Sequence, residues 1–161
     1  MTTPQQLTPY PRRQLAAQPI GYWTGAAHRE VVGRIRRELA TESLTQPHWW
    51  ILNHIAASPA HWTRAELAAK LTRYDDQGID FTEVFDDLAS RGWLTEDAAG
   101  TATLTLTLTE AGEAGRLRAK ERNLRAHEQT HAGITEEEYV ATLDVLRRVI
   151  ANLGGDSDLP E

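Results

Sequence analysis

Residues 63–112 read TRAELAAKLTRYDDQGIDFTEVFDDLASRGWLTEDAAGTATLTLTLTEAG. The pattern predicts a helix over 63–71, a turn, a helix over 80–91, and then two short strands at 93–95 and 101–108. Another helix begins directly after the second strand. This order is typical of a winged helix-turn-helix, a fold that usually places its second helix in the major groove of DNA. The expected fold is therefore mainly α with a small β-wing.

The charge of this segment does not suit a DNA-binding surface. Between Ile79 and Thr109 the sequence carries six acidic residues and a single arginine, Arg91, so the formal charge is −5. The whole chain has a net charge of −6, which gives it no general attraction for DNA phosphates. Any DNA binding must therefore depend on local cations.

Three of the predicted helices begin with the same short motif. In each, a side-chain oxygen can accept a hydrogen bond from a free backbone N–H of the first turn, and a glutamate three residues later can bond back. The pairs are Thr63 with Glu66, Asp80 with Glu83, and Thr135 with Glu138. The motif predicts where these helices begin, and it assigns Glu83 a structural role.

The composition is that of an ordinary soluble domain. The chain has 161 residues, of which 40% are apolar and 25% charged, enough for one domain with a proper core. It has no cysteine, which excludes disulfides and thiolate metal sites. No apolar run approaches the roughly 18 residues of a membrane span, and the N-terminus lacks an apolar signal core. We expect a cytoplasmic protein with no membrane contact and no cofactor.

Prolines and glycines divide the chain into an arm, a domain and a tail. Residues 1–18 are expected to be a mobile arm without helix, because prolines recur there. Residues 19–153 are expected to form one domain. Gly154 and Gly155 end its last helix, and residues 154–161 are expected to be a disordered tail.

Four segments of the chain resemble the MarR family of bacterial transcription regulators. They are Leu44–Leu52 (LTQPHWWIL), Arg64–Leu71 (RAELAAKL), Leu88–Leu94 (LASRGWL) and Leu108–Gly112 (LTEAG). Their order and spacing extend the resemblance over roughly residues 20–155. The resemblance implies a homodimer that binds duplex DNA and responds to a small molecule, often aromatic and anionic. It implies no enzymatic activity.

The resemblance also implies a winged-helix lobe over about residues 44–109, plus a helical dimerisation domain made by residues 20–40 and 110–153. The C-terminal helix gives an independent reason to expect a homodimer, because its apolar side chains recur at helical spacing. They are Tyr139, Leu143, Leu146, Val149, Ile150 and Leu153. A second subunit is the simplest cover for this stripe. The alternative is a monomer in which this helix folds back on the first one.

The residues expected to contact DNA also follow from the resemblance. They are Thr63, Arg64, Thr82, Glu83, Asp86, Asp87, Ser90 and Thr101. Family members usually carry arginine in the second helix of the motif and at the wing tip, whereas this chain has Glu83, Asp87 and no cation at the tip. A carboxylate can accept a hydrogen bond from cytosine N4, but it also faces the phosphates. The alternative is a winged-helix dimer that has lost operator binding and acts through ligand or protein contacts.

Aromatic residues and histidines predict a site for a small aromatic or anionic effector. In related proteins the ligand cleft lies between the first, second and fifth helices. The candidates on the first two helices are Tyr22, Trp23, His28, Trp50 and His54. Aromatic walls with a histidine suit such a molecule by stacking and charge-assisted hydrogen bonding. The alternative is that these side chains fill the junction between the lobe and the outer helices.

Residues 127–131 read HEQTH, which matches the HExxH pattern of zinc proteases. Two histidines four residues apart share a helix face and can hold one metal ion. A protease also needs a third ligand and a cleft, and no histidine follows His131. We therefore expect no metal site and no catalytic residue, and we interpret His127 and His131 as exposed polar side chains near a helix end.

Overall fold

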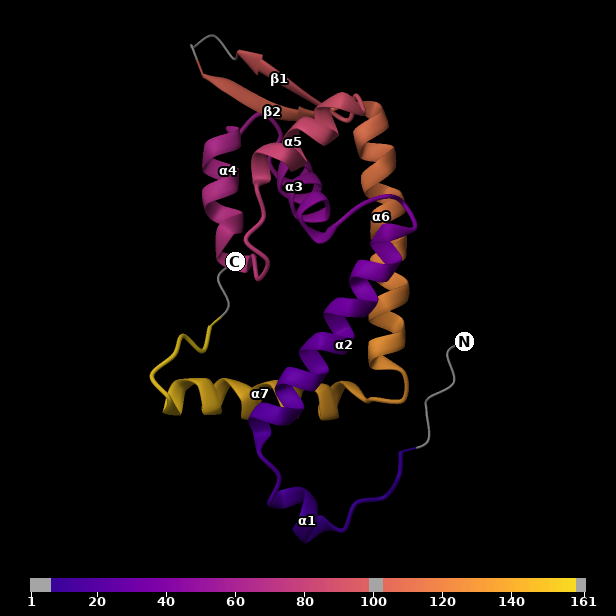
Figure 1. Ribbon diagram of the computed structural model, residues 1–161, viewed down its shortest axis with the longest axis vertical. Coiled ribbons are helices and arrows are strands. Elements are labelled where there is room, and N and C mark those ends of the chain that lie inside the picture. Colours follow the sequence, from indigo (N-terminus) through magenta and orange to yellow (C-terminus); the bar gives the residue numbers. More distant parts are fainter. Residues whose placement is uncertain (1–6, 99–102, 159–161) are drawn as a thin grey trace.

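Figure 1 shows the computed structural model, which describes residues 7–98 and 103–158. The elements are α1 (Arg12–Ala16), α2 (Ile20–Ala40), α3 (Gln46–Ala57), α4 (Arg64–Leu71), the 3-10 helix η1 (Thr72–Tyr74), α5 (Phe81–Ser90), β1 (Leu94–Ala98), β2 (Leu104–Leu108), α6 (Glu110–His131) and α7 (Glu136–Asn152). The predicted fold class is confirmed, because these residues form helices and one two-stranded sheet. No helix in the described ranges is long and apolar enough to cross a lipid bilayer.

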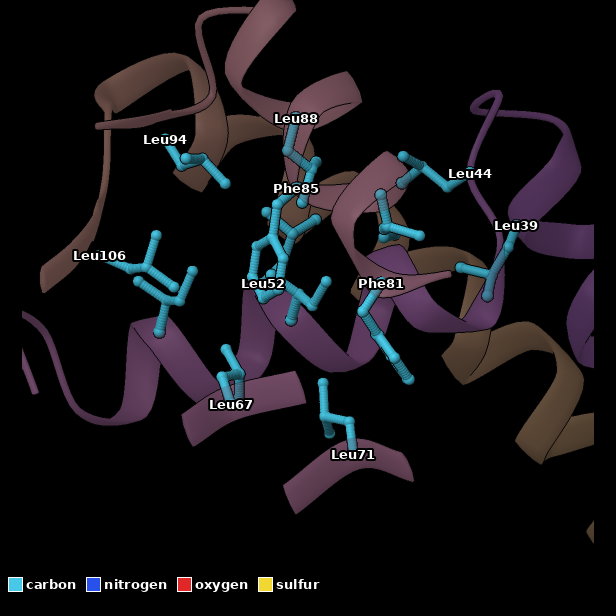
Figure 2. Close-up of a cluster of buried hydrophobic side chains, with 14 residues drawn as sticks. Leu39, Leu44, Leu52, Leu67, Leu71, Phe81, Phe85, Leu88, Leu94 and Leu106 are labelled. Atoms are coloured by element: carbon cyan, nitrogen blue, oxygen red, sulfur yellow. The ribbon is translucent and has the colours of Figure 1, made fainter. Parts of the chain in front are cut away.

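A lobe at one end of the molecule is built from α3, α4, α5 and the β-hairpin (Figure 1). Its elements meet in one buried cluster, which Figure 2 shows. The cluster consists of Leu39, Leu44, Ile51, Leu52, Ile55, Leu67, Leu71, Phe81, Val84, Phe85, Leu88, Leu94, Leu106 and Ala119. Each large side chain in it contributes roughly 1.5–3 kcal/mol by leaving water. This burial fixes which face of α5 points inward.

The wing is an antiparallel pair in which Leu94 lies opposite Leu108 and Ala98 opposite Leu104. It differs from the prediction in its limits: β1 continues to Ala98, and Thr103 lies outside β2. Trp93 also lies outside β1. The predicted DNA contact at the wing tip, Thr101, falls outside the described residues.

Two of the three predicted capping motifs are confirmed. Both bonds of the motif are present at Thr63 in α4 and at Thr135 in α7. The third prediction is confirmed for the cap and wrong for the return bond: Asp80 caps α5 by accepting from the N–H of Thr82 at 2.8 Å, but Glu83 makes no return bond within the described residues. The structural role predicted for Glu83 is therefore absent.

The joint between the lobe and α6 depends on two glycines. A Cβ at Gly112 would stand 1.9 Å from the carbonyl oxygen of Trp93, and one at Gly115 would stand 2.4 Å from the Trp93 ring. Both glycines are buried. The bare backbone of α6 therefore lets Trp93 pack directly against it, and α6 then extends from the lobe alongside α2 (Figure 1).

The N-terminal arm contains a short helix, which the sequence prediction excluded. Helix α1 has Pro11 as its N-cap residue and ends before Pro19. Proline disrupts a helix from inside, by removing an N–H donor and clashing with the preceding turn, and α1 has no proline within it. The prediction considered only how often proline occurs in the arm. The position of each proline determines whether a helix can form between them.

Candidate nucleic-acid interface and ligand pocket

The outward face of α5 is polar and acidic. Phe81, Val84, Phe85 and Leu88 are buried in the lobe. Four of the predicted DNA contacts, Thr82, Glu83, Asp86 and Ser90, are exposed, and Asp87 is half-buried. The lobe therefore presents this face to solvent, with Thr63 and Arg64 at the start of the neighbouring helix α4.

Arg64 is held by two carboxylates of its own chain. Its Nη1 donates to Asp86 at 2.5 Å, and its Nε donates to Glu96 of β1 at 2.8 Å. The guanidinium also lies 5.5 Å from the centre of the Phe85 ring. Although burial opposes the charge, the hydrogen bonds to Asp86 and Glu96 raise the pKa of Arg64. This arginine thus joins α4, α5 and the wing, which leaves fewer of its donors free for a phosphate.

Asp87 is held in a second network, which joins α5 to the start of α3. Its Oδ2 lies 2.9 Å from Nε2 of the buried His48 and accepts from Nε of Arg91 at 2.7 Å. His48 Nδ1 in turn accepts from the backbone N–H of Thr45 at 3.2 Å. Nε2 therefore carries the ring proton and donates a hydrogen bond to Asp87, as in a neutral imidazole.

The charges in this network are settled by burial and by neighbouring groups. Burial lowers the pKa of His48, an effect that the adjacent Asp87 only partly offsets. For Asp87, burial favours the protonated form, but hydrogen bonds from Arg91 and His48 outweigh it and lower the pKa of the carboxyl. A neutral His48 and an ionised Asp87 are the result. The roles of His48 and Glu96 could not be identified from the sequence, because each residue lies more than 30 positions from its partner.

Glu83 differs from the other carboxylates of α5. Asp80, Asp86 and Asp87 all accept hydrogen bonds from this chain. Within residues 7–98 and 103–158, Glu83 has neither a hydrogen bond nor an ion pair, and it is exposed.

Few cations of the lobe are free to meet phosphate. In its described part, Arg64 and Arg91 form ion pairs, and Lys70 and Arg73 form none. Lys70 lies 5.4 Å from the centre of the Trp62 ring. On α6, Arg118 and Arg122 each bind Glu42 at 3.1 Å. The described part of the lobe therefore offers few unpaired cations to a phosphate.

A cavity of about 350 Å³ lies between the lobe and the outer helices. It is lined by Val31, Ile35, Gln46, Trp49, Trp50, Asn123, Ala126, His127, Thr130, His131 and Tyr139. These residues come from α2, α3, α6 and the first turn of α7. The cavity thus has two indole rings and two imidazoles in its wall.

Of the predicted ligand-binding residues, Trp50 alone lines this cavity. Tyr22 and Trp23 pack edge to face with ring centres 5.6 Å apart, near the start of α2. His28 lies 3.8 Å from Asp76, and His54 bonds the backbone oxygen of Trp50. The structure does not bring these four together with Trp50 in one site.

The two histidines of the HEQTH motif lie on the cavity wall. Their ring centres are 4.0 Å apart, and the His131 ring is 4.3 Å from that of Tyr139. The interpretation of both as exposed polar side chains is incomplete, because His131 is half-buried. Within the described ranges no group of three or more metal-ligating side chains occurs.

The sequence matches no known family profile and no curated protein. The fold is similar to that of solved transcription regulators. A MarR-family regulator from Rhodococcus sp. RHA1 is 21% identical with a TM-score of 0.62, over 81% of this chain and 91% of that one. The PcaV regulator from Streptomyces coelicolor is 21% identical with a TM-score of 0.67, over 85% and 98%. The oxidized form of MarR from E. coli is 20% identical with a TM-score of 0.62, over 83% and 95%. The chain has the MarR-type winged-helix fold.

Proposed function

We propose that this chain is a homodimeric, DNA-binding transcription regulator whose affinity for its operator changes when a small aromatic or anionic molecule binds. The observation that carries the proposal is the outward polar face of α5, presented by a lobe of the MarR type. In winged-helix proteins this helix enters the major groove. A binding function, with no chemistry at the site, fits the residues present.

The apolar surface of α7 supports the homodimer. None of its residues is buried in the described chain, and Tyr139, Leu143 and Ile150 are 37%, 41% and 42% exposed. Isolated apolar residues on a surface are common, but a continuous stripe at helical spacing is a feature of interfaces. Sedimentation velocity should give a mass near twice that of the 18.0 kDa chain.

The charges of the lobe predict the character of DNA binding. With Lys70 and Arg73 as its described cations outside ion pairs, each subunit neutralises few phosphates. Each neutralised phosphate contributes about −0.9 to the slope of log affinity against log salt. We expect modest affinity and a shallow salt dependence.

The experiment that tests the proposal is selection of binding sites from random duplex DNA at low and moderate salt. A symmetric dimer that places two α5 helices on one face of the duplex should enrich a palindrome with half-sites about 34 Å apart. Failure to enrich any sequence at low salt contradicts the proposal.

The cavity beside Trp49 and Trp50 supports the response to a small molecule. Its volume of about 350 Å³ is within the usual range for ligand pockets. A salicylate-like acid should quench tryptophan fluorescence saturably, by stacking on the indoles. The variant His131→Ala should weaken this binding, and His28→Ala, outside the cavity, should leave it unchanged. A linear, unsaturable signal would contradict the pocket.

One observation favours a second function. Asp86 and Glu96 neutralise Arg64, so the acidic face of α5 has no free cation beside it among the described residues of that face. A winged-helix dimer of this kind could instead have lost operator binding and act through ligand or protein contacts. It would still sediment as a dimer, but it would enrich no duplex.

A further inference from the structure

Glu83 is the carboxylate of α5 that makes no bond to the described part of the chain. The cap belongs to Asp80, while Asp86 and Asp87 hold cations of the chain itself. Glu83 has no such contact within the described residues, and its side chain is exposed. Both carboxylate oxygens of Glu83 are therefore without a partner among the described residues, whereas Asp80, Asp86 and Asp87 each have one oxygen engaged.

The place of Glu83 in α5 suits contact with bases. It lies in the first turn of the helix. In helix-turn-helix proteins, residues near the N-terminus of the second helix contact base edges. A carboxylate is repelled by phosphates, so a favourable partner for it must be a hydrogen-bond donor inside the groove.

A side chain that only accepts hydrogen bonds distinguishes the four bases. In the major groove, guanine presents the acceptors N7 and O6, and thymine presents the acceptor O4. Adenine presents an amino donor beside the acceptor N7, which repels a carboxylate. Cytosine presents the N4 amino group with no acceptor of its own next to it, so it is the base that a free glutamate favours.

We propose that Glu83 selects a cytosine in each half of the operator by accepting a hydrogen bond from its N4 amino group. This inference rests on the proposed function, in which α5 reads duplex DNA. Thr82 and Ser90 carry hydroxyls, which both donate and accept and so discriminate less. Glu83 is thus the residue of α5 with the sharpest base preference.

The test is site selection with the wild type and with Glu83→Gln. Glutamine pairs with the N6 and N7 atoms of adenine. The wild type should enrich cytosine at one symmetric position of the palindrome, and the variant should enrich adenine at that position with the rest of the site unchanged. In direct titrations, replacing this cytosine should weaken wild-type binding about tenfold, a typical effect of one wrong base pair. The variant should show the reverse preference.

Two further variants complete the experiment. Glu128→Gln makes the same change at an exposed site near the far end of α6 and should enrich the wild-type sequence. Glu83→Ala should accept any base at the selected position, with its fold checked by circular dichroism. A palindrome whose base preferences are the same in wild type and in both Glu83 variants overturns this inference and leaves the proposed function standing. No enrichment by the wild type overturns both.

Discussion

At the scale of single residues, carboxylates that look unsuited to DNA have partners within the chain. Asp86 bonds Arg64, and Asp87 bonds His48 and Arg91. An ionised side chain with cationic or N–H donors around it presents a weaker field than an isolated charge. The net charge of the segment therefore overstates how strongly α5 repels phosphate.

His48 should make the stability of the lobe depend on pH. Burial lowers its pKa below the unfolded value of 6.5, so the unfolded state binds more protons once the pH falls below that value. The free energy of unfolding is therefore independent of the titration of His48 above about pH 6.5. It decreases as the pH falls from there toward the pKa of His48 in the folded state, by at most about 1.4 kcal/mol per pH unit. Urea unfolding of the wild type between pH 7 and 5 should show this decline.

His48→Gln should flatten the decline, because glutamine can donate to Asp87 and accept from Thr45 but does not titrate. The control is His61→Gln, at an exposed histidine. The pKa of Asp87 is lowered from 3.8, so this carboxyl changes its protonation only below the pH range of the experiment and does not contribute to the decline. Identical slopes for the wild type and His48→Gln would contradict the role of the buried histidine.

Arg64→Ala should destabilise the lobe by about 1–2 kcal/mol, since it removes hydrogen bonds between charged groups and leaves Glu96 half-buried without its partner. Chemical denaturation measures the effect. Arg73→Ala removes an exposed arginine that is outside the ion pairs of the described chain, and it should change stability by less than about 0.5 kcal/mol. Equal effects of the two variants would show that Arg64 does not join α4 to the wing.

At the scale of elements, local motifs were predictable and contacts between elements were not. The caps at Thr63 and Thr135 need only residues within one turn, so the sequence alone identifies them. The bonds from His48 to Asp87 and from Arg64 to Glu96 need α3, α4, α5 and β1 to be packed first. The return bond predicted from Glu83 to Asp80 is an exception among the local motifs: the aspartate bonds to Thr82, and Glu83 makes no bond within the described residues.

The joint between Trp93 and α6 should tolerate no side chain at Gly112. An added Cβ would stand 1.9 Å from a backbone oxygen, which cannot move as a flexible side chain can. Gly112→Ala should cost about 1–3 kcal/mol, the usual range for overpacking. Gly25→Ala, inside α2, meets only the end of the Arg29 side chain at 3.6 Å and should be neutral or stabilising, because alanine favours helix. Thermal unfolding of the two variants compares them, and similar midpoints would contradict the close packing.

At the scale of the whole molecule, helix length explains why Tyr22 and Trp23 do not line the cavity. Tyr22 and Val31 belong to the same helix, but nine residues at 1.5 Å each separate them by about 13 Å. The cavity begins at Val31, so aromatic residues near the start of α2 are out of its reach. The cavity is lined by residues of α2, α3 and α6, the three helices between which the resemblance predicts a ligand cleft, but the sequence could not give the point at which they converge.

We predict that the exposed apolar stripe on α7 holds the two subunits of the proposed dimer together. Binding of the dimer to a palindromic DNA site then depends on this stripe. Leu143→Glu places a charge at the middle of this stripe, where Leu143 is 41% exposed in the single chain. Burying an unpaired carboxylate is costly, so the dimer should weaken by about 100-fold or more. Sedimentation velocity should show a monomer at micromolar concentration, and binding to a palindrome should fall because one lobe contacts one half-site.

The control is Ala141→Glu. Ala141 lies two residues away on the other side of α7, so this variant should leave the dimer intact. If Leu143→Glu still sediments as a dimer, the subunits must meet elsewhere, and the exposed start of α2, with Tyr22 at 64% exposure, becomes the surface to vary next.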